Sequence, residues 1–294
     1  MTPAAGTRTT VAAERAGPDV SSAPIAVAVP HDGVESALRY AARAALLRGR
    51  PLLVVGPATT GRGDAVPGFL RHAAEVAEVL AGPGVPVDIR LTPDERVETA
   101  LAACRDAHQV VVHRSNELHL LQSLSYGPIG TKALTEVVCV PPGWSPRRDD
   151  ARPVVVAIGT PFHAADLVKP ALEHARIQAT SLSVVHGWSL PAHLGPEEDG
   201  VLGTLWAAEL EKRLRHQVCA LHDGVEFEVV VRRGVGADVV LEAAEHAQLL
   251  VLGRNTVSAD HLCHLGRIAR AAVRESPCPV VLLPAPEASI EATA

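Results

Sequence analysis

Two glycines in the second half of the chain are the residues best placed for chemistry. Gly253 closes the apolar run LLVLG, and Gly266 opens a helical pattern that carries Arg267 and Arg270. A glycine at a strand end lets backbone N–H groups approach a phosphate, and a helix N-terminus adds unpaired donors and the positive end of a dipole. Arginine can clamp a phosphate through two nitrogens, with Arg254 as a third candidate. The same residues could instead turn the chain and carry solvated charges, and the residues alone leave both interpretations open.

Other chemistry finds less support. His261, Cys263 and His264 are metal-binding types close together, but a structural zinc site usually needs four ligands, so we predict no metal site. The chain lacks GxSxG, GxxxxGK[ST] and a GxGxxG after the first strand. These absences argue against a serine hydrolase, a P-loop NTPase and a dinucleotide dehydrogenase. Asp260 is the carboxylate near Gly253 and Gly266 and is best interpreted as a loop charge. We therefore expect no enzymatic activity.

Strands and helices alternate along the chain, and they must position these glycines. In the first half, we predict strands at 24–29, 50–56, 86–91, 109–113 and 137–141, with helices at 35–48 and 69–80. In the second half, we predict strands at 153–158, 181–186, 226–232, 248–252 and 279–283, with helices at 168–176, 201–221 and 237–246. The strands are continuous apolar runs, which indicates a parallel sheet covered by helices on both faces.

The two halves repeat one another. Residues 101–114 (LAACRDAHQVVVHR) align without a gap to residues 241–254 (LEAAEHAQLLVLGR), and Cys139 is paired with Cys278 at the opening of each last strand. The sequence therefore predicts two tandem, doubly wound α/β domains, each with a five-stranded parallel sheet. Ligands of such sheets bind at the carboxyl ends of the strands, which is where Gly253 lies.

Composition bounds the function. The chain has 294 residues, a net charge of −6 and 47% hydrophobic residues, so it has neither the basic balance of a nucleic-acid-binding protein nor an apolar run long enough to cross a bilayer. Five scattered cysteines indicate reduced thiols and a cytoplasmic location. Trp144, Trp188 and Trp206 are interpreted as packing or interface residues. We expect a disordered tail over 1–22, domains over 23–142 and 153–285, a linker over 143–152 and a second tail over 286–294.

Several stretches carry a family resemblance. They are LSVVHGWSLP at 182–191, LLVLGRN at 249–255 with Gly266 after it, ESPCPVVLLP at 275–284, and residues 36–55 of the first half. Together they resemble the universal stress protein family, and the resemblance covers about residues 24–142 and 152–285. It implies a tandem two-domain member with a five-stranded, Rossmann-like fold that in many members binds ATP.

The resemblance also implies a site. The family has an Asp after the first strand and Gly-x2-Gly-x9-Gly-Ser/Thr after the fourth. In the second domain Gly253 and Gly266 match, whereas Thr256 and Arg267 depart from the pattern and the Asp is missing. The resemblance places candidate ATP contacts at Gly159, Thr160, Leu252, Gly253, Thr256, Gly266, Arg267 and Ile268. The loss of one charged hydrogen bond would weaken binding by about one to two decades.

The first domain departs further from this pattern. His113 falls on the first glycine, where we expect it to plug the pocket, and only Gly127 survives, so we predict no ATP there. The chain is then a non-enzymatic stress-response protein with ATP in the second domain, or a nucleotide-free interaction protein, with slow ATP hydrolysis as a third and weaker hypothesis. We expect the last strands of the two domains to pair as a pseudo-dimer and leave open a dimer of whole chains and an unknown protein partner.

Overall fold

The computed structural model describes residues 23–31, 33–58, 66–114, 135–159, 164–189, 196–221, 224–256 and 264–284. The chain divides into two compact units, and the division in the middle of the chain falls between Pro146 and Arg147. Each unit is described by itself below.

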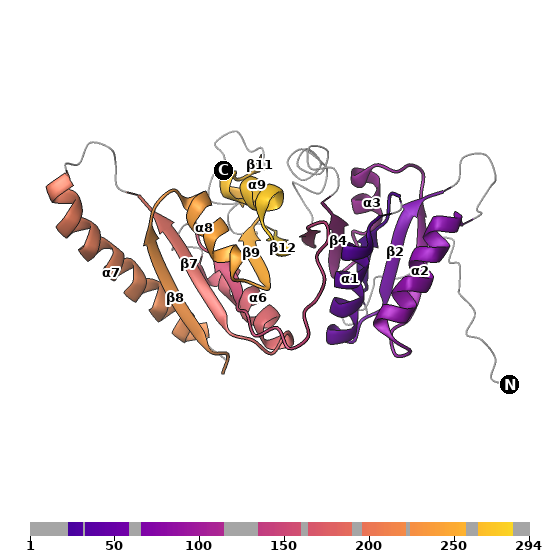
Figure 1. Ribbon diagram of the computed structural model, residues 1–294, viewed down its shortest axis with the longest axis horizontal. Helices are drawn as coiled ribbons and strands as arrows, with labels where there is room; N and C mark the ends of the chain where they lie inside the picture. Colours follow the sequence, from indigo (N-terminus) through magenta and orange to yellow (C-terminus); the bar gives the residue numbers. More distant parts are fainter. Residues whose placement is uncertain are drawn as a thin grey trace, which may run out of the picture. The chain divides into compact units, whose positions relative to one another are not determined.

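The first unit alternates strands and helices, as expected. In chain order it has β1 (Ile25–Ala28), α1 (Glu35–Arg48), β2 (Leu52–Pro57), α2 (Gly68–Ala81), β3 (Val87–Thr92), α3 (Val97–Ala103), β4 (Gln109–His113) and β5 (Glu136–Val140). Its strands lie in the order β3-β2-β1-β4-β5, and neighbouring strands pair in parallel. Figure 1 shows α1 and α2 beside this sheet. Because crossovers are right-handed, α1 and α2 cover one face and α3 covers the other.

The second unit repeats this plan with longer elements. It has β6 (Val154–Ala157), α6 (Ala164–Ile177), β7 (Leu182–Trp188), α7 (Pro196–Leu221), β8 (Phe227–Arg233), α8 (Gly236–Glu245), β9 (Leu249–Gly253), β10 (Asn255–Thr256), β11 (His264–Leu265), α9 (Arg267–Glu275) and β12 (Val280–Leu283). Strands β12-β9-β6-β7-β8 pair in parallel in this order, and β10 pairs with β11. The order reverses between β6 and β9, so their carboxyl ends form the crevice where ligands of such sheets bind.

The predicted fold class is confirmed. In the part that the structure describes, each unit contains a sheet of five parallel strands whose central residues are buried. Val27 in β1 and Val111 in β4 are fully buried, as are Val156 in β6 and Val251 in β9. Apolar side chains on both faces of these strands explain the continuous apolar runs, because helices cover both sides of a parallel sheet.

Two predicted helix starts are wrong. Helix α6 begins at Ala164 rather than at residue 168, and it contains Pro170. Helix α7 begins at Pro196 rather than at residue 201, so residues 196–200 are helical as well. Proline is well tolerated in the first turn of a helix, where its missing N–H would have no partner, and Pro196 occupies that place in α7.

The predicted equivalence of Cys139 and Cys278 is also wrong. Val111 pairs with Val138, and its repeat partner Val251 pairs with Val281. The same register places Cys139 opposite Val112 inside β5, whereas Cys278 lies two residues before β12 begins. Strand pairing, rather than the similar apolar surroundings of the two cysteines, fixes the alignment.

Residues 150–152 are held by the second unit. Arg152 binds the Asp150 carboxylate through Nε at 2.8 Å and Nη2 at 2.6 Å. Gln248 Nε2 and Thr180 Oγ1 donate to the carbonyl oxygen of Arg152 at 2.8 and 2.9 Å. Hydrogen bonds therefore hold residues 150–152, the end of the predicted linker, in place before β6. Trp144 earlier in the segment packs instead on Tyr40 of α1, with ring centroids 5.6 Å apart, in keeping with its predicted packing role.

Candidate functional site

The carboxyl end of β6 is open at Gly159. No heavy atom lies within 4 Å of the position that a Cβ of Gly159 would occupy. The residue sits beside the strand-order reversal, as expected for a ligand contact. Thr160, the next predicted contact, lies outside the described residues.

Gly253 ends β9, where it pairs with Leu283 of β12. A Cβ on Gly253 would meet only the Leu167 side chain, at 3.4 and 3.7 Å, which is ordinary van der Waals contact. Packing therefore does not require glycine at this position. Thr256 lies three residues on, in the short strand β10.

Gly266 is the N-cap of α9 and adopts φ −59° and ψ 158°, a backbone conformation open to any residue. No side chain caps the helix, and its first turn has no acidic residue. In the first turn of α9, the Arg270 N–H donates to the Gly266 carbonyl oxygen at 2.9 Å. The earlier N–H groups of an α-helix have no partner within the helix, so this end of α9 presents donors and a positive dipole end.

The arginines near this end differ in their surroundings. Arg267 and Arg270 are exposed, whereas the side chain of Arg254 is only 1% exposed. The backbone N–H of Arg254 donates to the Leu283 carbonyl oxygen at 2.8 Å, which continues the pairing of β9 with β12. The interpretation of these arginines as solvated charges is thus wrong for Arg254 and agrees with the exposure of the other two.

Two of the predicted contacts turn their side chains into the protein. Leu252 is buried in β9. The Cδ1 atom of Ile268 lies 3.0 Å from the position of a Cβ on Gly236, so Ile268 packs over the start of α8. Leu252 can therefore meet a ligand only through its backbone, whereas Ile268 remains partly exposed.

At the end of β7, sequence reasoning missed His186 and gave Trp188 only a packing or interface role. They lie two residues apart, so they share one face of the strand. His186 Nδ1 lies 2.7 Å from the Ile158 carbonyl oxygen, which fixes the imidazole at the edge of the crevice. Trp188 is 9% exposed, and its indole Nε1 makes no hydrogen bond in the described part of the chain. The polar and aromatic residues that close the apolar run LSVVHGW are the signal that could have found them.

Comparisons with known proteins agree with this architecture. The sequence model of the Universal stress protein family matches residues 151–284, the whole of the second unit's sheet and its crevice. The second half of the chain is therefore similar to the universal stress protein family. Its crevice contains Gly159, Gly253 and Gly266.

Individual relatives extend this result. A universal stress protein of Thermus aquaticus, encoded in the QAH/OAS sulfhydrylase 3′ region, is 29% identical over 135 residues, 44% of this chain and 96% of the relative. The crystal structure of a universal stress protein from Archaeoglobus fulgidus covers 92% of this chain and 100% of its own, with 14% identity and a TM-score of 0.56. That likeness shows the same fold over both halves. Another from Archaeoglobus fulgidus, solved in complex with dAMP, covers 46% of this chain and 98% of its own, with 23% identity and a TM-score of 0.31.

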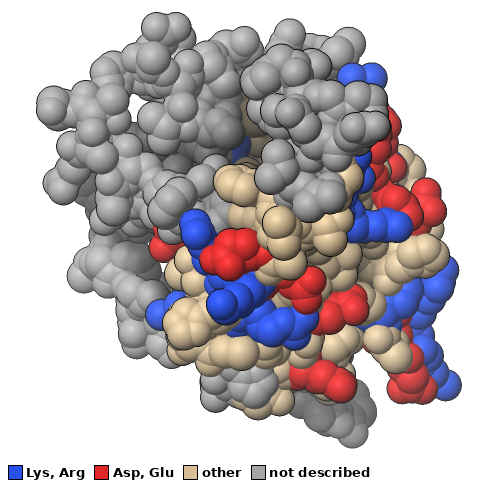
Figure 2. All heavy atoms as spheres, turned by 90° about the vertical axis from the view of Figure 1, so that its left-hand side faces the viewer, with Lys and Arg blue, Asp and Glu red and all other residues tan. Residues whose placement is uncertain are grey.

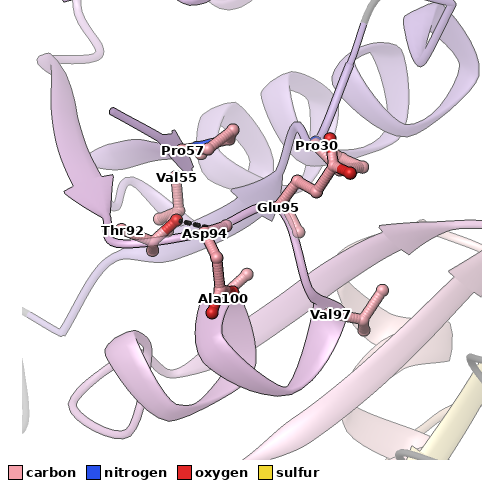
Figure 3. A pocket seen from close by; sticks show the side chains of 10 residues that line it. Pro30, Val55, Pro57, Thr92, Asp94, Glu95, Val97 and Ala100 are labelled. Atoms are coloured by element: carbon pink, nitrogen blue, oxygen red, sulfur yellow. Dashed lines mark hydrogen bonds between the residues drawn. The ribbon is translucent and has the colours of Figure 1, made fainter. Parts of the chain in front are cut away.

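The first domain has a small pocket at the carboxyl ends of β1, β2 and β3 (Figure 3). It measures about 200 Å³, including space open to solvent, and its walls include Pro30, Val55, Pro57 and Ala100. His113, the expected plug, does not line this pocket; it ends β4 half-buried, and burial lowers its pKa.

The polar rim of this pocket is acidic. Figure 3 shows Asp94 and Glu95 beside the pocket, and the Thr92 hydroxyl donates to the Asp94 carbonyl oxygen at 2.8 Å. Hydrogen bonds from Arg96 and then from Thr99 lower the pKa of Asp94 to about 2. Asp94 therefore stays negative under ordinary conditions, and the Arg96 guanidinium, whose Nη2 lies 2.6 Å from its carboxylate, balances that charge.

Metal sites and membrane spans find no support in the described ranges. There, His, Cys, Asp and Glu side chains nowhere gather in threes as a metal site would need, while His261 and Cys263 fall outside these ranges. Among the helices that the structure describes, none combines the length and the hydropathy needed to cross a bilayer.

Proposed function

We propose that this chain is a non-enzymatic stress-response protein of the cytoplasm whose second domain binds an adenine nucleotide, ATP or a relative of it, through the phosphates. The observation that carries the proposal is the N-terminus of α9. It has no capping side chain and no acidic residue in its first turn, yet it begins with the exposed Arg267. A cation is unfavourable at the positive end of a helix dipole, and a bound anion reverses that penalty.

The rest of the crevice suits the same ligand. Gly159 is open, and Gly253 ends the strand that leads to α9, so a nucleotide could extend from the end of β6 to the phosphates at α9. The dAMP held by the Archaeoglobus fulgidus relative belongs to the same ligand class. Because the Asp expected after the first strand is missing, we expect binding about 10- to 100-fold weaker than with that carboxylate.

Calorimetric titration with ATP, ADP and AMP, each with and without Mg²⁺, tests the proposal. We expect one site per chain, and we expect Gly266→Glu to abolish it by placing a carboxylate at the N-terminus of α9. The matched control is Gly68→Glu, the same change at the start of α2, where a Cβ meets no atom within 4 Å. Absence of heat and of a thermal shift at millimolar nucleotide, or a site that Gly266→Glu leaves intact, would overturn the proposal. Phosphate release from ATP measured on the same samples should stay at background.

A nucleotide-free interaction protein is the second candidate function. The small, acid-rimmed pocket of the first domain favours it, as do the exposed apolar residues of α7. In that case both crevices stay empty at millimolar nucleotide, and a pull-down should recover a partner whether or not ATP is present.

A further inference from the structure

Four large apolar side chains are exposed at the ends of two helices of the first domain. They are Leu46 and Leu47 in the last turn of α1, which are 54% and 43% exposed, and Val79 and Leu80 in the last turn of α2, which are 83% and 38% exposed. Helices α1 and α2 pack against one another, and each runs from the carboxyl end of one strand to the amino end of the next (Figure 1). Their last turns therefore lie side by side, and we call these four residues the α1–α2 patch. Exposed apolar patches of this kind often mark an interaction surface.

The fold does not require large apolar residues at this place. After α1, the Arg50 N–H donates to the Ala45 carbonyl oxygen at 2.9 Å, and after α6 the Thr180 N–H donates in the same way to Ala175 at 3.0 Å. Helices α2 and α7 end at the same distance from the strands that follow them. The residues of the second domain that correspond to the α1–α2 patch are therefore Arg176, Ile177, Cys219 and Ala220.

Three of these four counterparts are charged or small, so folding alone does not account for the apolar patch of the first domain. Figure 2 shows the molecule from the side on which α7 of the second domain lies, and blue and red side chains lie next to one another there. The exposed apolar surface at the ends of α1 and α2 is thus a property of the first domain, and a bound partner would explain it.

The exposed side of α1 is basic. Arg39 is exposed and Arg43 is partly exposed, and they precede Leu46 by seven and three residues, a spacing that places side chains on one side of a helix. The ion pairs found among the described residues include neither arginine. The other charged residues of α1 and of the turn after it are Glu35, Arg48 and Arg50. The acidic one of these lies in the first turn, at the opposite end of α1 from the patch.

The exposed side of α2 is acidic beside the patch. Glu78 directly precedes Val79, Glu75 lies four residues before it, and both glutamates are exposed. Arg71 and His72 are exposed about two turns before the patch. His72 Nδ1 lies 4.0 Å from the Glu75 carboxylate, and an exposed pair of this kind contributes little in water, so Glu75 remains able to bind a cation. The α1–α2 patch therefore lies between a basic helix surface and an acidic one.

We propose that the α1–α2 patch is the docking site of an amphipathic helix that belongs to another protein. The apolar side of that helix covers the patch, through residues at three- and four-residue spacing, as in other complexes in which a helix lies in a groove. Glutamates or aspartates on one of its flanks face Arg39 and Arg43, and lysines or arginines on the other flank face Glu75 and Glu78. Such charge complementarity sets the orientation of the bound helix and excludes partners with other charge patterns.

A lipid surface fits this face less well than a helix does. An anionic bilayer attracts arginines such as Arg39 and Arg43, but it would bring its phosphates equally close to Glu75 and Glu78. A helix can instead carry opposite charges on its two flanks, which matches the different charges of α1 and α2. Both helices have 14 residues, or about 21 Å, so a partner helix of four to five turns covers the face.

Fluorescence anisotropy with a synthetic helix tests the proposal on the whole chain. The probe is a labelled peptide of about 18 residues with leucines on one side, glutamates on one flank and lysines on the other. We expect it to bind with a dissociation constant of about 10–100 µM. The control peptide has the same composition and the same leucines, but its glutamates and lysines are mixed on both flanks. It should bind at least about tenfold more weakly, because like charges then meet on both sides.

Two sets of variants separate the apolar and the charged contributions. The double variant Leu46→Ser, Val79→Ser should bind the probe at least about tenfold more weakly, and its circular dichroism spectrum should not change, because both residues are exposed. The matched control is Leu205→Ser on α7, where Leu205 is 63% exposed, and it should bind as the natural chain does. Arg39→Glu should weaken binding about three- to tenfold, whereas Lys169→Glu, at the corresponding exposed place in α6, should not.

Other results would refute the proposal. A chain that does not bind the probe at about 300 µM, or that binds both peptides equally well, has no docking site of this chemistry. A Leu205→Ser variant that loses as much affinity as the double variant would mean that the peptide binds to any exposed apolar residue. Binding to vesicles with anionic lipids that Leu46→Ser, Val79→Ser abolishes would assign the patch to a membrane. Dimers that dissociate in the same double variant would assign it to a second copy of the chain.

Discussion

His186 Nδ1 lies 2.7 Å from the carbonyl oxygen of Ile158, and this contact joins the ends of β7 and β6. A carbonyl oxygen can only accept, so Nδ1 carries the hydrogen. The first domain has a different residue at the equivalent position. Val55 and Val185 pair with Ala28 and Ala157 in the two sheets, so Gly56 occupies the position of His186.

Replacing His186 with leucine should destabilise the second domain. The carbonyl group of Ile158 would lose its partner while remaining among buried residues, which costs about 1–3 kcal/mol. Urea unfolding followed by circular dichroism measures the change. His72→Ala on α2 is the control, because His72 is exposed there, and equal stability of the two variants would contradict the expectation.

Gly56→Ala should destabilise the first domain more than an ordinary strand substitution. The new Cβ would lie 2.4 Å from the Val29 carbonyl oxygen and 2.6 Å from Leu70 Cδ2. Val29 directly follows β1, and its N–H donates to the Val55 carbonyl oxygen at 2.7 Å, so its backbone has little room to move. A loss of about 1–3 kcal/mol therefore follows from overpacking. Gly253→Ala, whose Cβ meets only Leu167 at 3.4 Å, should change stability little. Thermal unfolding of both variants tests this expectation. Equal melting temperatures of the two variants would contradict it.

The ion pair between Arg90 and Asp106 should make stability depend on pH. Arg90 Nη1 and Nη2 donate to Asp106 at 2.7 and 2.9 Å, and these hydrogen bonds lower the pKa of Asp106. A carboxylate with a lowered pKa in the folded state adds stability above its unfolded pKa of about 3.9, and this contribution is lost as the pH falls through the folded value.

Asp106→Asn should accordingly cost at most about 1 kcal/mol at pH 7, because the pair is partly exposed. The difference from the natural chain should shrink between pH 4 and pH 2. Urea unfolding at pH 7, 4 and 2 measures it, with Asp88→Asn as the control for loss of a carboxylate in β3. A difference that stays constant with pH would show that Asp106 acts through packing rather than charge.

The described cysteines should react with thiol reagents very unequally. Burial raises the pKa of Cys104 and of Cys139 to about 12, so at pH 8 only about one thiol in 10⁴ is ionised. Cys278 is buried too, whereas Cys219 on α7 is exposed. In a Cys263→Ser background, a chromogenic disulfide should label one thiol quickly and the other three only after denaturation. Adding Cys219→Ser should remove the fast phase, and its persistence would mean that a buried cysteine opens readily.

The sequence by itself determined the architecture of each half. Continuous apolar runs such as 109–113 and 249–253 predict strands that are covered on both faces. The gapless alignment of 101–114 with 241–254 predicts that the same arrangement of strands and helices occurs twice. Helix α1 also begins and ends where predicted, because its pattern is complete between the turns that flank it, with Gly49 in the left-handed conformation at its end.

Tertiary structure decided what depends on distant partners. The glycines and acidic residues near the start of α7 resemble a loop in sequence, yet Gly203 is buried and the segment is helical. Cys139 and Cys278 look equivalent until strand pairing sets the register. The burial of Arg254 and the hydrogen bond from His186 to Ile158 likewise depend on segments that are remote in sequence. Hydrophobic periodicity can be recognised from neighbouring residues alone. The burial and hydrogen bonding of a polar side chain depend instead on which remote segment lies beside it in the folded chain.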